Sequence, residues 1–287
     1  MATTKEIKLL GVVITYNPDL SEVTKNISSY INHLETLIIW DNTPSKSFDI
    51  NSFPESFRNK IICMGISQNV FISKALNEAV KYANQHHFTH ILTMDQDSRF
   101  EAGHFSTYVD LVQQNLNEPF IFGPNYNFKE PTDNIVVNKH HLITSGQIVS
   151  LEILRKIGLY REDYEIDCVD YEFCYRAKKF GYSAKMVTTV LLHHEFGNLK
   201  KSKLGFFTSN YSTMRLYHIA RNNIILKREY PDQVTYTEIF DRVIKHIFKI
   251  IIAENNKISK TITIFNGLFS GFRKRDLFNI LHLEKNA

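Results

Sequence analysis

Cysteine, net charge and long apolar runs are scarce in this sequence of 287 residues. Its 3 cysteines lack the spacing of a metal site and cannot all pair with one another, so we expect reduced thiols, as in cytosolic proteins. The formal net charge of +4 is too small to indicate a nucleic-acid partner. No apolar run approaches the roughly 20 residues of a membrane-spanning helix. The polar start at Met1 to Lys8 shows no signal peptide, and we therefore expect a cytoplasmic protein.

Hydrophobic residues make up 43% of the chain, which is enough for a sizeable core. In the first hundred residues, short apolar runs alternate with segments of helical periodicity. This alternation predicts parallel strands joined by right-handed helical crossovers. We interpret residues 1–100 as the nucleotide-binding half of an α/β domain. The expected strands are 8–15, 36–40, 60–64 and 91–95, and the expected helices are 19–31 and 73–86.

The second half of the chain is less regular. We place its boundaries at 101–205 for the acceptor-binding and catalytic half, and at 206–287 for a helical, basic and aromatic region. The tail contains two amphipathic stretches. The expected strands are 120–124, 142–146 and 183–192, the expected helix is 170–180 before Gly181, and the amphipathic stretches are 239–252 and 272–283.

The run Ile91–Ser98 ends an apolar strand in two carboxylates, Asp95 and Asp97. In open α/β sheets, ligands bind outside the carboxyl ends of the strands. Side chains alternate along a strand, so these two acids project to the same side. Such a pair suits Mg²⁺ or Mn²⁺ held together with a phosphate-bearing substrate. A solvated loop with two acids is the alternative, because this short motif is common by chance.

Seven short motifs in a fixed order give the chain a resemblance to a known family. Over residues 8–230 it resembles family 2 glycosyltransferases of the GT-A type, closest to the bacterial rhamnosyltransferases. The fourth and last motifs carry the likeness to rhamnosyltransferases. The motifs are VITYN at 13–17, WDN at 40–42, NVFISKALN at 69–77, LTMDQDS at 92–98, DCVDYEFCYR at 167–176, HEFG at 194–197 and RLYHIARN at 215–222.

The resemblance implies an α/β fold of the GT-A type, which is a Rossmann-like, mostly parallel sheet flanked by helices, here with a C-terminal helical extension. It also implies a nucleotide site. Thr15, Tyr16 and Asn17 would lie beside the base and ribose, and Asp41 would accept a hydrogen bond from the base. Asp95 would reach the ribose or the waters of the metal. An ordinary turn after each strand is the alternative for these residues.

The same resemblance assigns a metal site and a general base. Asp97 would bind Mg²⁺ or Mn²⁺ directly, and His194 would be a third partner for metal or phosphate. His193 should point elsewhere if this segment is a strand. Asp170 aligns with the general base of the family, at a helix start where the helix dipole favours its charged form. Glu172 and Asp167 compete for this role, although Glu172 is better explained as the i,i+4 ion-pair partner of Arg176.

Further residues are implied around the diphosphate and the donor sugar. Arg215 and Arg221 could close over the diphosphate or merely solvate a helix face. Ser145 and Gly146 could present a backbone amide to the sugar or form a simple turn. Asn69 begins the third motif and belongs to the same group of expected ligands.

The resemblance implies an inverting glycosyltransferase that moves L-rhamnose from dTDP-L-rhamnose to a bacterial surface polysaccharide, O-antigen or capsule. A UDP-sugar donor is an alternative, because Phe71 and Ser73 stand where the family usually has glycine and alanine. A phosphatase of the haloacid-dehalogenase type is a rival, since its own D-x-D motif also follows a strand. A non-catalytic sugar-binding protein is a third interpretation.

The partners expected are the nucleotide sugar and a glycan acceptor, which the resemblance suggests is linked to a polyprenyl diphosphate. We expect no nucleic acid. Basic residues alternate with Phe, Ile and Leu in the C-terminal stretches, a pattern typical of helices that lie on anionic lipid. These helices would hold the protein at the inner face of the membrane, or would form a homodimer interface.

Overall fold

The computed structural model describes residues 6–44, 49–116, 120–126, 134–194, 200–201 and 205–273. It consists of two compact units. The N-terminal unit comprises Met1–Glu165 with Val169–Glu195, and the C-terminal unit comprises Ile166–Cys168 with Phe196–Ala287. The boundary we placed at residue 205 stays a prediction.

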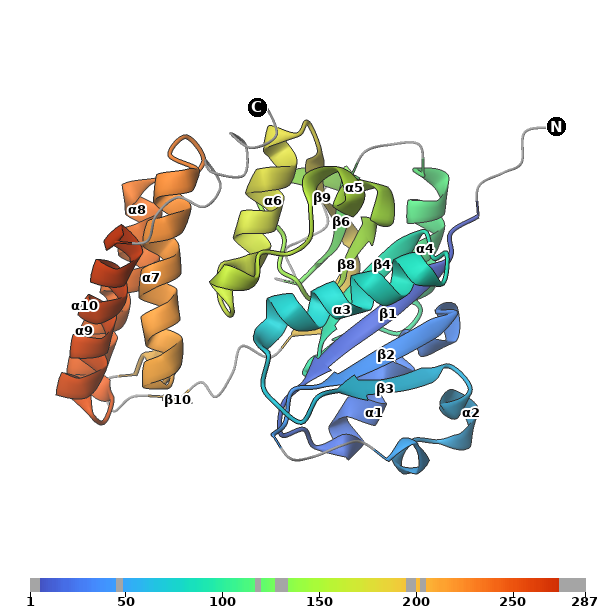
Figure 1. Cartoon of the computed structure of the whole chain (residues 1–287), viewed down its shortest axis with the longest axis horizontal. Helices are drawn as coiled ribbons and strands as arrows, with labels where there is room; N and C mark the ends of the chain where they lie inside the picture. Colours follow the sequence, from blue (N-terminus) through green and yellow to red (C-terminus); the bar gives the residue numbers. More distant parts are fainter. Residues whose placement is uncertain are drawn as a thin grey trace. The chain divides into compact units, whose positions relative to one another are not determined.

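The N-terminal unit is an α/β domain with a curled central sheet (Figure 1). Its strands are β1 Leu9–Thr15, β2 Thr36–Asp41, β3 Ile61–Gly65, β4 His90–Asp95, β5 Ser98–Phe100, β6 Phe120–Asn125, β7 Val136–Lys139, β8 Gln147–Ser150 and β9 Ser183–His194. Its α-helices are α1 Leu20–Ser28, α2 Glu55–Arg58, α3 Phe71–Gln85, α4 His104–Gln114, α5 Leu151–Ile157 and α6 Val169–Lys179. Short 3₁₀ turns are η1 Ile31–His33, η2 Ile50–Ser52 and η3 Glu162–Tyr164.

Four parallel strands form the first part of the sheet, in the order β3-β2-β1-β4. Strand β1 pairs with β2 and β4, and most of its side chains are buried, as expected for a sheet covered on both faces. Helices α1 and α3 supply apolar stripes that pack on it. This arrangement brings the carboxyl ends of β1, β2 and β4 to one edge, and it confirms the parallel half predicted from the sequence.

The rest of the sheet is mixed. Strand β8 pairs antiparallel with both β4 and β6, whereas β6 and β9 are parallel to each other. Strand β9 also pairs antiparallel with β5 and β7. Since β9 is continuous from Ser183 to His194, it reaches across the sheet from β6 to β5. The fold class predicted from the sequence is confirmed.

One predicted strand is wrong. Residues 142–146 contain no strand, and β8 begins only at Gln147. Leu142 is buried as a loop residue, because its side chain packs against the face of Gly123 in β6. Gly146 has φ +84°, a conformation that ends an extended run, and its N–H donates to the Thr93 carbonyl at 2.7 Å. A Cβ at Gly146 would come within 2.5 Å of the Pro124 ring.

The C-terminal unit is mainly helical. Its elements are β10 Lys200–Lys201, β11 Phe207–Thr208, α7 Thr213–Glu229, α8 Tyr236–Ile239, the π-helical turn η4 Phe240–Ile244, α9 Lys245–Ala253 and α10 Lys257–Arg273. Helix α10 packs closely along α7, as Figure 1 shows. A Cβ at Gly267 would lie 2.5 Å from the Tyr217 carbonyl oxygen, and one at Gly271 would lie 2.7 Å from that of Arg221. These glycines therefore allow the two helix backbones to approach.

The first predicted amphipathic stretch, 239–252, is helical as expected. The second was predicted at 272–283, and its two described residues, Phe272 and Arg273, belong to helix α10, Lys257–Arg273. Residues 274–287 lie outside the described residues. Within the described part of the chain, no helix is both long and apolar enough to cross a membrane.

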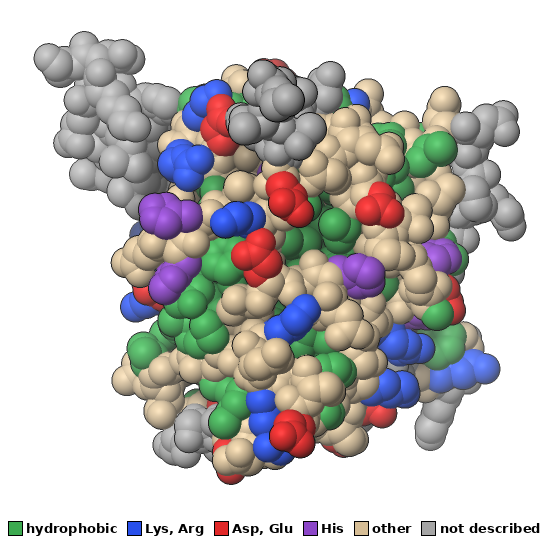
Figure 2. All heavy atoms as spheres, turned by 90° about the vertical axis from the view of Figure 1, so that its right-hand side faces the viewer, with side chains coloured by type: hydrophobic (Ala, Val, Ile, Leu, Met, Phe, Trp, Pro, Cys, Tyr) green, Lys and Arg blue, Asp and Glu red, His purple; other side chains and the backbone are tan. Residues whose placement is uncertain are grey.

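The three cysteines are free thiols, as predicted. Burial raises the pKa of Cys174 to about 12, so this thiol stays protonated. On the face shown in Figure 2, basic and acidic side chains are interspersed rather than gathered by sign. This pattern agrees with the small net charge of +4.

Candidate active site

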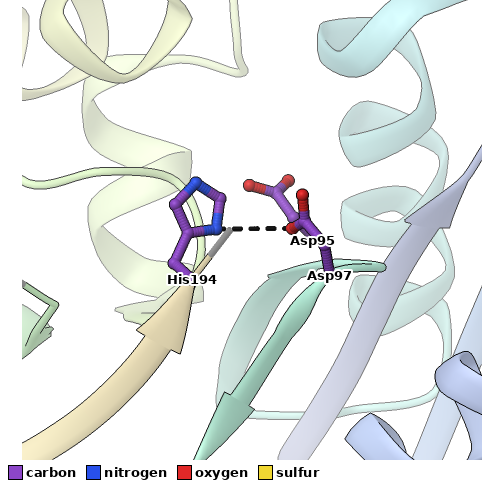
Figure 3. A group of neighbouring side chains, drawn as sticks. All are labelled: Asp95, Asp97 and His194. Atoms are coloured by element: carbon purple, nitrogen blue, oxygen red, sulfur yellow. Dashed lines mark ion pairs between the residues drawn. The ribbon is translucent and has the colours of Figure 1, made fainter. Parts of the chain in front are cut away.

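Three potential metal ligands converge at the carboxyl edge of the sheet. Asp95 is the last residue of β4, Asp97 lies in the turn that follows, and His194 is the last residue of β9. Each offers a ligand atom, and these atoms lie within 4.8 Å of one another. The Nδ1 atom of His194 is 3.3 Å from Oδ1 of Asp97, and Figure 3 shows the ring turned toward both acids. All three side chains are partly exposed, so the cluster is open to solution.

The donor set fits a divalent cation. Two carboxylates so close together repel each other, and a bound cation would relieve that repulsion. Carboxylate oxygens with one imidazole suit Mn²⁺, and the oxygens alone suit Mg²⁺. The cluster can therefore hold the metal that the sequence predicted, using the residues that the sequence named.

Strand pairing explains why His194 is present. In the β5–β9 ladder, Ser98 is opposite His194 and Arg99 is opposite His193. Side chains alternate, so His194 faces the acids, while His193 turns to the other side and contacts Glu101 at 2.6 Å. The prediction that His193 points elsewhere is confirmed. The hydrogen bond to His193 lowers the pKa of the Glu101 carboxyl.

Ser98 contributes to the cluster, although sequence reasoning gave it no role. Its side chain is fully buried, and its Oγ lies 2.7 Å from His194 Nδ1 and 3.4 Å from Asp97 Oδ1. The hydroxyl contacts the same ring nitrogen that faces Asp97, so it orients the imidazole ring toward the acids and would give way to a cation bound at Nδ1. The signal was available in the sequence, because Ser98 directly follows the D-x-D motif.

Gln96, between the two acids, is a second residue that sequence reasoning missed. Its Oε1 accepts a hydrogen bond from the Tyr16 N–H at 2.7 Å, and its Nε2 donates to the Tyr16 carbonyl at 3.4 Å. Its own carbonyl accepts from Asn26 Nδ2 at 2.8 Å. We call these contacts the Gln96 clamp. It ties the D-x-D turn to the end of β1 and to α1.

The predicted nucleotide-binding residues lie at neighbouring strand ends. Thr15 is paired with Asp41 across β1 and β2, and Ile14 is paired with Asp95 across β1 and β4. The Thr15 hydroxyl is buried and donates to the Trp40 carbonyl at 3.2 Å. The side chain of Tyr16, by contrast, is 49% exposed. The register therefore brings these predicted residues together with the acidic cluster.

The end of β2 is fixed by a turn. Asp41 Oδ1 accepts from the Thr43 N–H at 2.8 Å, and the Thr43 hydroxyl accepts from the Asn17 N–H at 2.8 Å. Asn17 has φ +46°, in the left-handed region that asparagine tolerates better than most residues. Both the turn and the base-binding interpretations of Asp41 remain compatible with this geometry, because the turn uses one carboxylate oxygen.

Asn69 precedes α3, where its Oδ1 accepts from the Phe71 N–H at 2.9 Å. Asn42, which follows β2, donates to the Phe71 carbonyl at 3.1 Å and accepts from the Val70 N–H at 3.2 Å. The second and third sequence motifs are thereby held together. The side chain of Asn69 is exposed, so it remains accessible to a ligand.

Ser145 and Gly146 lie against the end of β4. The buried Ser145 hydroxyl accepts from the Asp95 N–H at 3.1 Å, and the Gly146 carbonyl accepts from the Tyr108 hydroxyl at 3.0 Å. They form a turn beside Asp95 that holds its backbone N–H through the Ser145 hydroxyl. Contact with a donor sugar stays a prediction for both.

Asp170 lies in the first turn of α6, half-buried, and its Oδ1 accepts from the Tyr171 N–H at 2.9 Å. Glu172 is 1% exposed and forms a two-bond ion pair with Arg176 at 2.9 and 3.1 Å. Arg176 also donates to the carbonyls of Ile157 and Leu159. The prediction that Glu172 and Arg176 form an i,i+4 ion pair is confirmed. Glu172 is thus committed to the interior, which leaves Asp170 as the better candidate for a base.

Arg215 and Arg221 both belong to α7 of the C-terminal unit. Arg215 pairs with Asp167 at 3.2 Å and stacks over the ring of Tyr211 at 4.3 Å. Arg221 is 9% exposed and donates to Asn222 Oδ1 at 3.2 Å. Asp167, the second competitor for the base, is therefore engaged by an arginine. The sixth sequence motif continues past His194 through residues 195–197, which lie outside the described residues.

Comparison with known proteins finds a sequence relative that covers most of the chain. The chain is 26% identical over 275 residues to the dTDP-rhamnosyl transferase RfbF of Shigella flexneri, covering 87% of this chain and 90% of the relative. No protein-family model matches the chain. Among solved structures, the crystal structure of GalNAc-T7 with UDP, GalNAc and Mn2+ superposes with a TM-score of 0.59 at 10% identity, over 90% of this chain. This chain spans 57% of that structure.

The chain has the GT-A fold. A GT-A glycosyltransferase sheet with a rhamnosyltransferase as its sequence relative confirms the resemblance that the seven motifs indicated. The predicted enzyme class, a glycosyltransferase, agrees with both findings. The phosphatase rival loses its support, because its motif requires a different structural context.

Proposed function

We propose that this GT-A protein is a metal-dependent, inverting glycosyltransferase that transfers L-rhamnose from dTDP-L-rhamnose to a bacterial surface polysaccharide acceptor. One observation carries the proposal. Asp95, Asp97 and His194 converge where neighbouring strand ends present the predicted nucleotide-binding residues. The sequence likeness to a dTDP-rhamnosyl transferase over 87% of the chain supports the donor.

In this proposal the acidic cluster holds the donor diphosphate. Asp97 and His194 would bind Mg²⁺ or Mn²⁺, and Asp95 would contact the ribose or waters of the metal. The cation supplies charge neutralisation for the leaving diphosphate. Ser98 orients the imidazole ring toward the acids before the cation binds. The crystal structure of GalNAc-T7, which shares the fold, contains Mn2+ together with UDP.

The nucleotide would lie over the ends of β1 and β2. Tyr16 is exposed there and offers its ring to the base, while Asp41 has a second carboxylate oxygen beside the one used in its turn. Thr15 and Asn17 shape the floor of this site through their backbone and buried contacts. Carbonyl and carboxylate acceptors at strand ends suit recognition of a base N–H.

Asp170 is proposed as the general base. Its carboxylate takes the proton from the acceptor hydroxyl as the hydroxyl oxygen attacks the anomeric carbon and the bond to the diphosphate breaks. The sugar configuration inverts, so a β-linked donor gives an α-rhamnoside. The position of Asp170 in the first turn of α6 favours its charged form, which a base requires.

The remaining predicted ligands are proposed with less direct roles. Asn69, Ser145 and Gly146 line or support the donor side of the N-terminal unit. Arg215 and Arg221 are proposed diphosphate ligands, and Arg215 would have to exchange Asp167 for phosphate oxygens to act in this way.

A UDP-sugar donor is the alternative. Phe71 begins α3 with φ +62°, a strained conformation for a large residue at a position where the family usually has glycine. A bulky side chain at this position would alter the shape of the donor pocket. The acceptor, the polyprenyl-diphosphate carrier and the cytoplasmic location stay predictions.

The test is a thermal-shift series on the purified protein with dTDP, dTDP-L-rhamnose, UDP and UDP-sugars, each with and without Mn²⁺. A ligand that binds the folded state raises the melting temperature. We expect the largest metal-dependent rise with dTDP-L-rhamnose. A larger rise with a UDP-sugar would replace the donor, and no rise with any nucleotide would refute the proposed function.

A further inference from the structure

Helix α10 has one buried face and an opposite face that is apolar and exposed. One face, formed by Lys260, Ile264, Gly267 and Gly271, is buried against the C-terminal unit. The opposite face carries five large apolar side chains at spacings of four, three, four and three residues, which places them in one stripe. They are 54–78% exposed: Ile258, Ile262, Phe265, Phe269 and Phe272. We call this set the α10 stripe.

A second helix extends the apolar surface. In α9, Ile250 is fully buried, whereas Phe248, Ile251 and Ile252 are 50–56% exposed. Helices α9 and α10 pack together, and Figure 1 shows them side by side. Single exposed apolar residues are ordinary, but eight of them on two adjacent helices mark a surface that is normally covered.

The charge of the surrounding segment distinguishes between the kinds of surface that could cover the α10 stripe. From residue 245 to 275 the sequence holds seven Lys or Arg and one acid, Glu254. That acid is buried and pairs with the buried Lys260 at 2.6 Å. Lys257 and Arg273 are exposed at the two ends of α10, and Arg273 stacks over Phe269 at 4.2 Å. The apolar stripe therefore lies between exposed cations.

A second copy of the chain is a poor match for this surface. A two-fold interface would oppose the same cationic segment to itself, because each subunit contributes an identical patch. An anionic lipid surface satisfies both features, since acyl chains receive the Phe and Ile side chains while headgroups attract Lys and Arg. We propose that α9 and α10 dock the protein on the surface of an anionic phospholipid membrane through the α10 stripe.

The proposal is tested with the full-length protein, without any donor, so that it stands apart from the proposed glycosyl transfer. Binding is measured by co-sedimentation with vesicles of phosphatidylglycerol and, separately, of phosphatidylcholine. We expect binding to phosphatidylglycerol that weakens in high salt and little binding to phosphatidylcholine. The double variant Phe265→Ser, Phe269→Ser should weaken binding to phosphatidylglycerol about tenfold or more, because two ring insertions are lost.

Two further variants separate the causes. Phe180→Ser removes an apolar side chain that is 45% exposed in the N-terminal unit, and it should leave vesicle binding unchanged. Lys257→Gln with Arg273→Gln should weaken binding to phosphatidylglycerol about fivefold for each charge removed. Because all these side chains are exposed, circular dichroism melting curves should match the wild type.

Three results would overturn the proposal. One is the absence of binding to phosphatidylglycerol, and another is equal binding to both lipids with no effect of salt. The third is a dimer in sedimentation velocity that Phe265→Ser, Phe269→Ser converts to monomer, because a second copy would then cover the stripe.

Discussion

The D-x-D turn shows how much a single side chain contributes at the residue scale. Asp95 and Asp97 carry the charge, but their positions depend on neutral neighbours. Ser98 orients His194, and Ser145 holds the backbone N–H of Asp95. Both hydroxyls are buried, so replacing either serine by a residue without a hydroxyl would remove a defined hydrogen bond.

Replacing Asp97 by Asn should abolish the metal-dependent stabilisation of the protein. The substitution keeps the shape but removes the charge that would bind the cation. The measurement is the rise in melting temperature on adding Mn²⁺ with dTDP. Glu101→Gln is the control, because that nearby carboxylate contacts His193 on the other side of β9. A full Mn²⁺ response in the Asp97 variant would exclude it as a ligand.

Asp170→Asn should lower the turnover number by about 10³-fold, the range contributed by a general base. Binding of dTDP should change little, because the residue contacts the acceptor rather than the nucleotide in our proposal. Rates and nucleotide affinity are measured on the same preparation, with the exposed α4 variant Asp110→Asn as control. Wild-type turnover would remove Asp170 from this role.

Strand order and helix packing decide most of the site at the element scale. The strands β1, β2 and β4 were predictable because apolar runs mark buried parallel strands. The same rule predicted a strand wrongly at 142–146, because Leu142 is buried in a loop against Gly123. Helix α10 lies in the region 206–287 that the sequence predicts to be helical, but its bounds were not predicted, because an exposed apolar face opposite the buried one blurs the single stripe that marks a helix.

The site was predictable to the extent that its residues lie in short motifs. Asp95, Asp97 and His194 were named from the sequence, and the β5–β9 ladder brings them together. The Gln96 clamp was not predictable. It joins residues 80 apart in the chain, and a glutamine between two acids has no pattern that announces a backbone partner.

The buried ion pair in α6 leads to a prediction about stability. Glu172→Gln should lower the free energy of unfolding by about 3 kcal/mol, because Arg176 would remain in the interior without its charged partner. Chemical denaturation measures this. The matched control is Glu152→Gln in α5, whose i,i+4 partner Lys156 is exposed, and it should leave stability nearly unchanged. Equal effects would show that burial does not matter here.

Acid sensitivity is a property of the whole molecule, and His90 at the start of β4 contributes to it. Burial lowers its pKa from 6.5 to about 4, so the unfolded chain binds more protons between these values. The stabilisation is present above pH 6.5 and is lost as the pH falls toward 4, by roughly 3 kcal/mol at most.

His90→Gln should therefore flatten the fall in unfolding free energy between pH 6.5 and 4. The wild-type and variant curves are compared by urea denaturation at several pH values. His87→Gln is the control, since that histidine is exposed. Parallel curves for His90→Gln and the wild type would show that another group controls this range.

The Gln96 clamp couples the binding of the two ligands of the proposed site, the cation and the nucleotide. An ion that immobilises Asp95 and Asp97 would also immobilise Tyr16, because the amide between the acids grips its backbone. Cation and nucleotide should then bind cooperatively, and thermodynamic reciprocity requires each to raise the affinity of the other by one common factor. In titration calorimetry, Gln96→Ala should lower that factor to the part that direct contact between cation and diphosphate supplies. With cooperative binding, the enzyme would bind the nucleotide and the ion together more strongly than it binds either one alone.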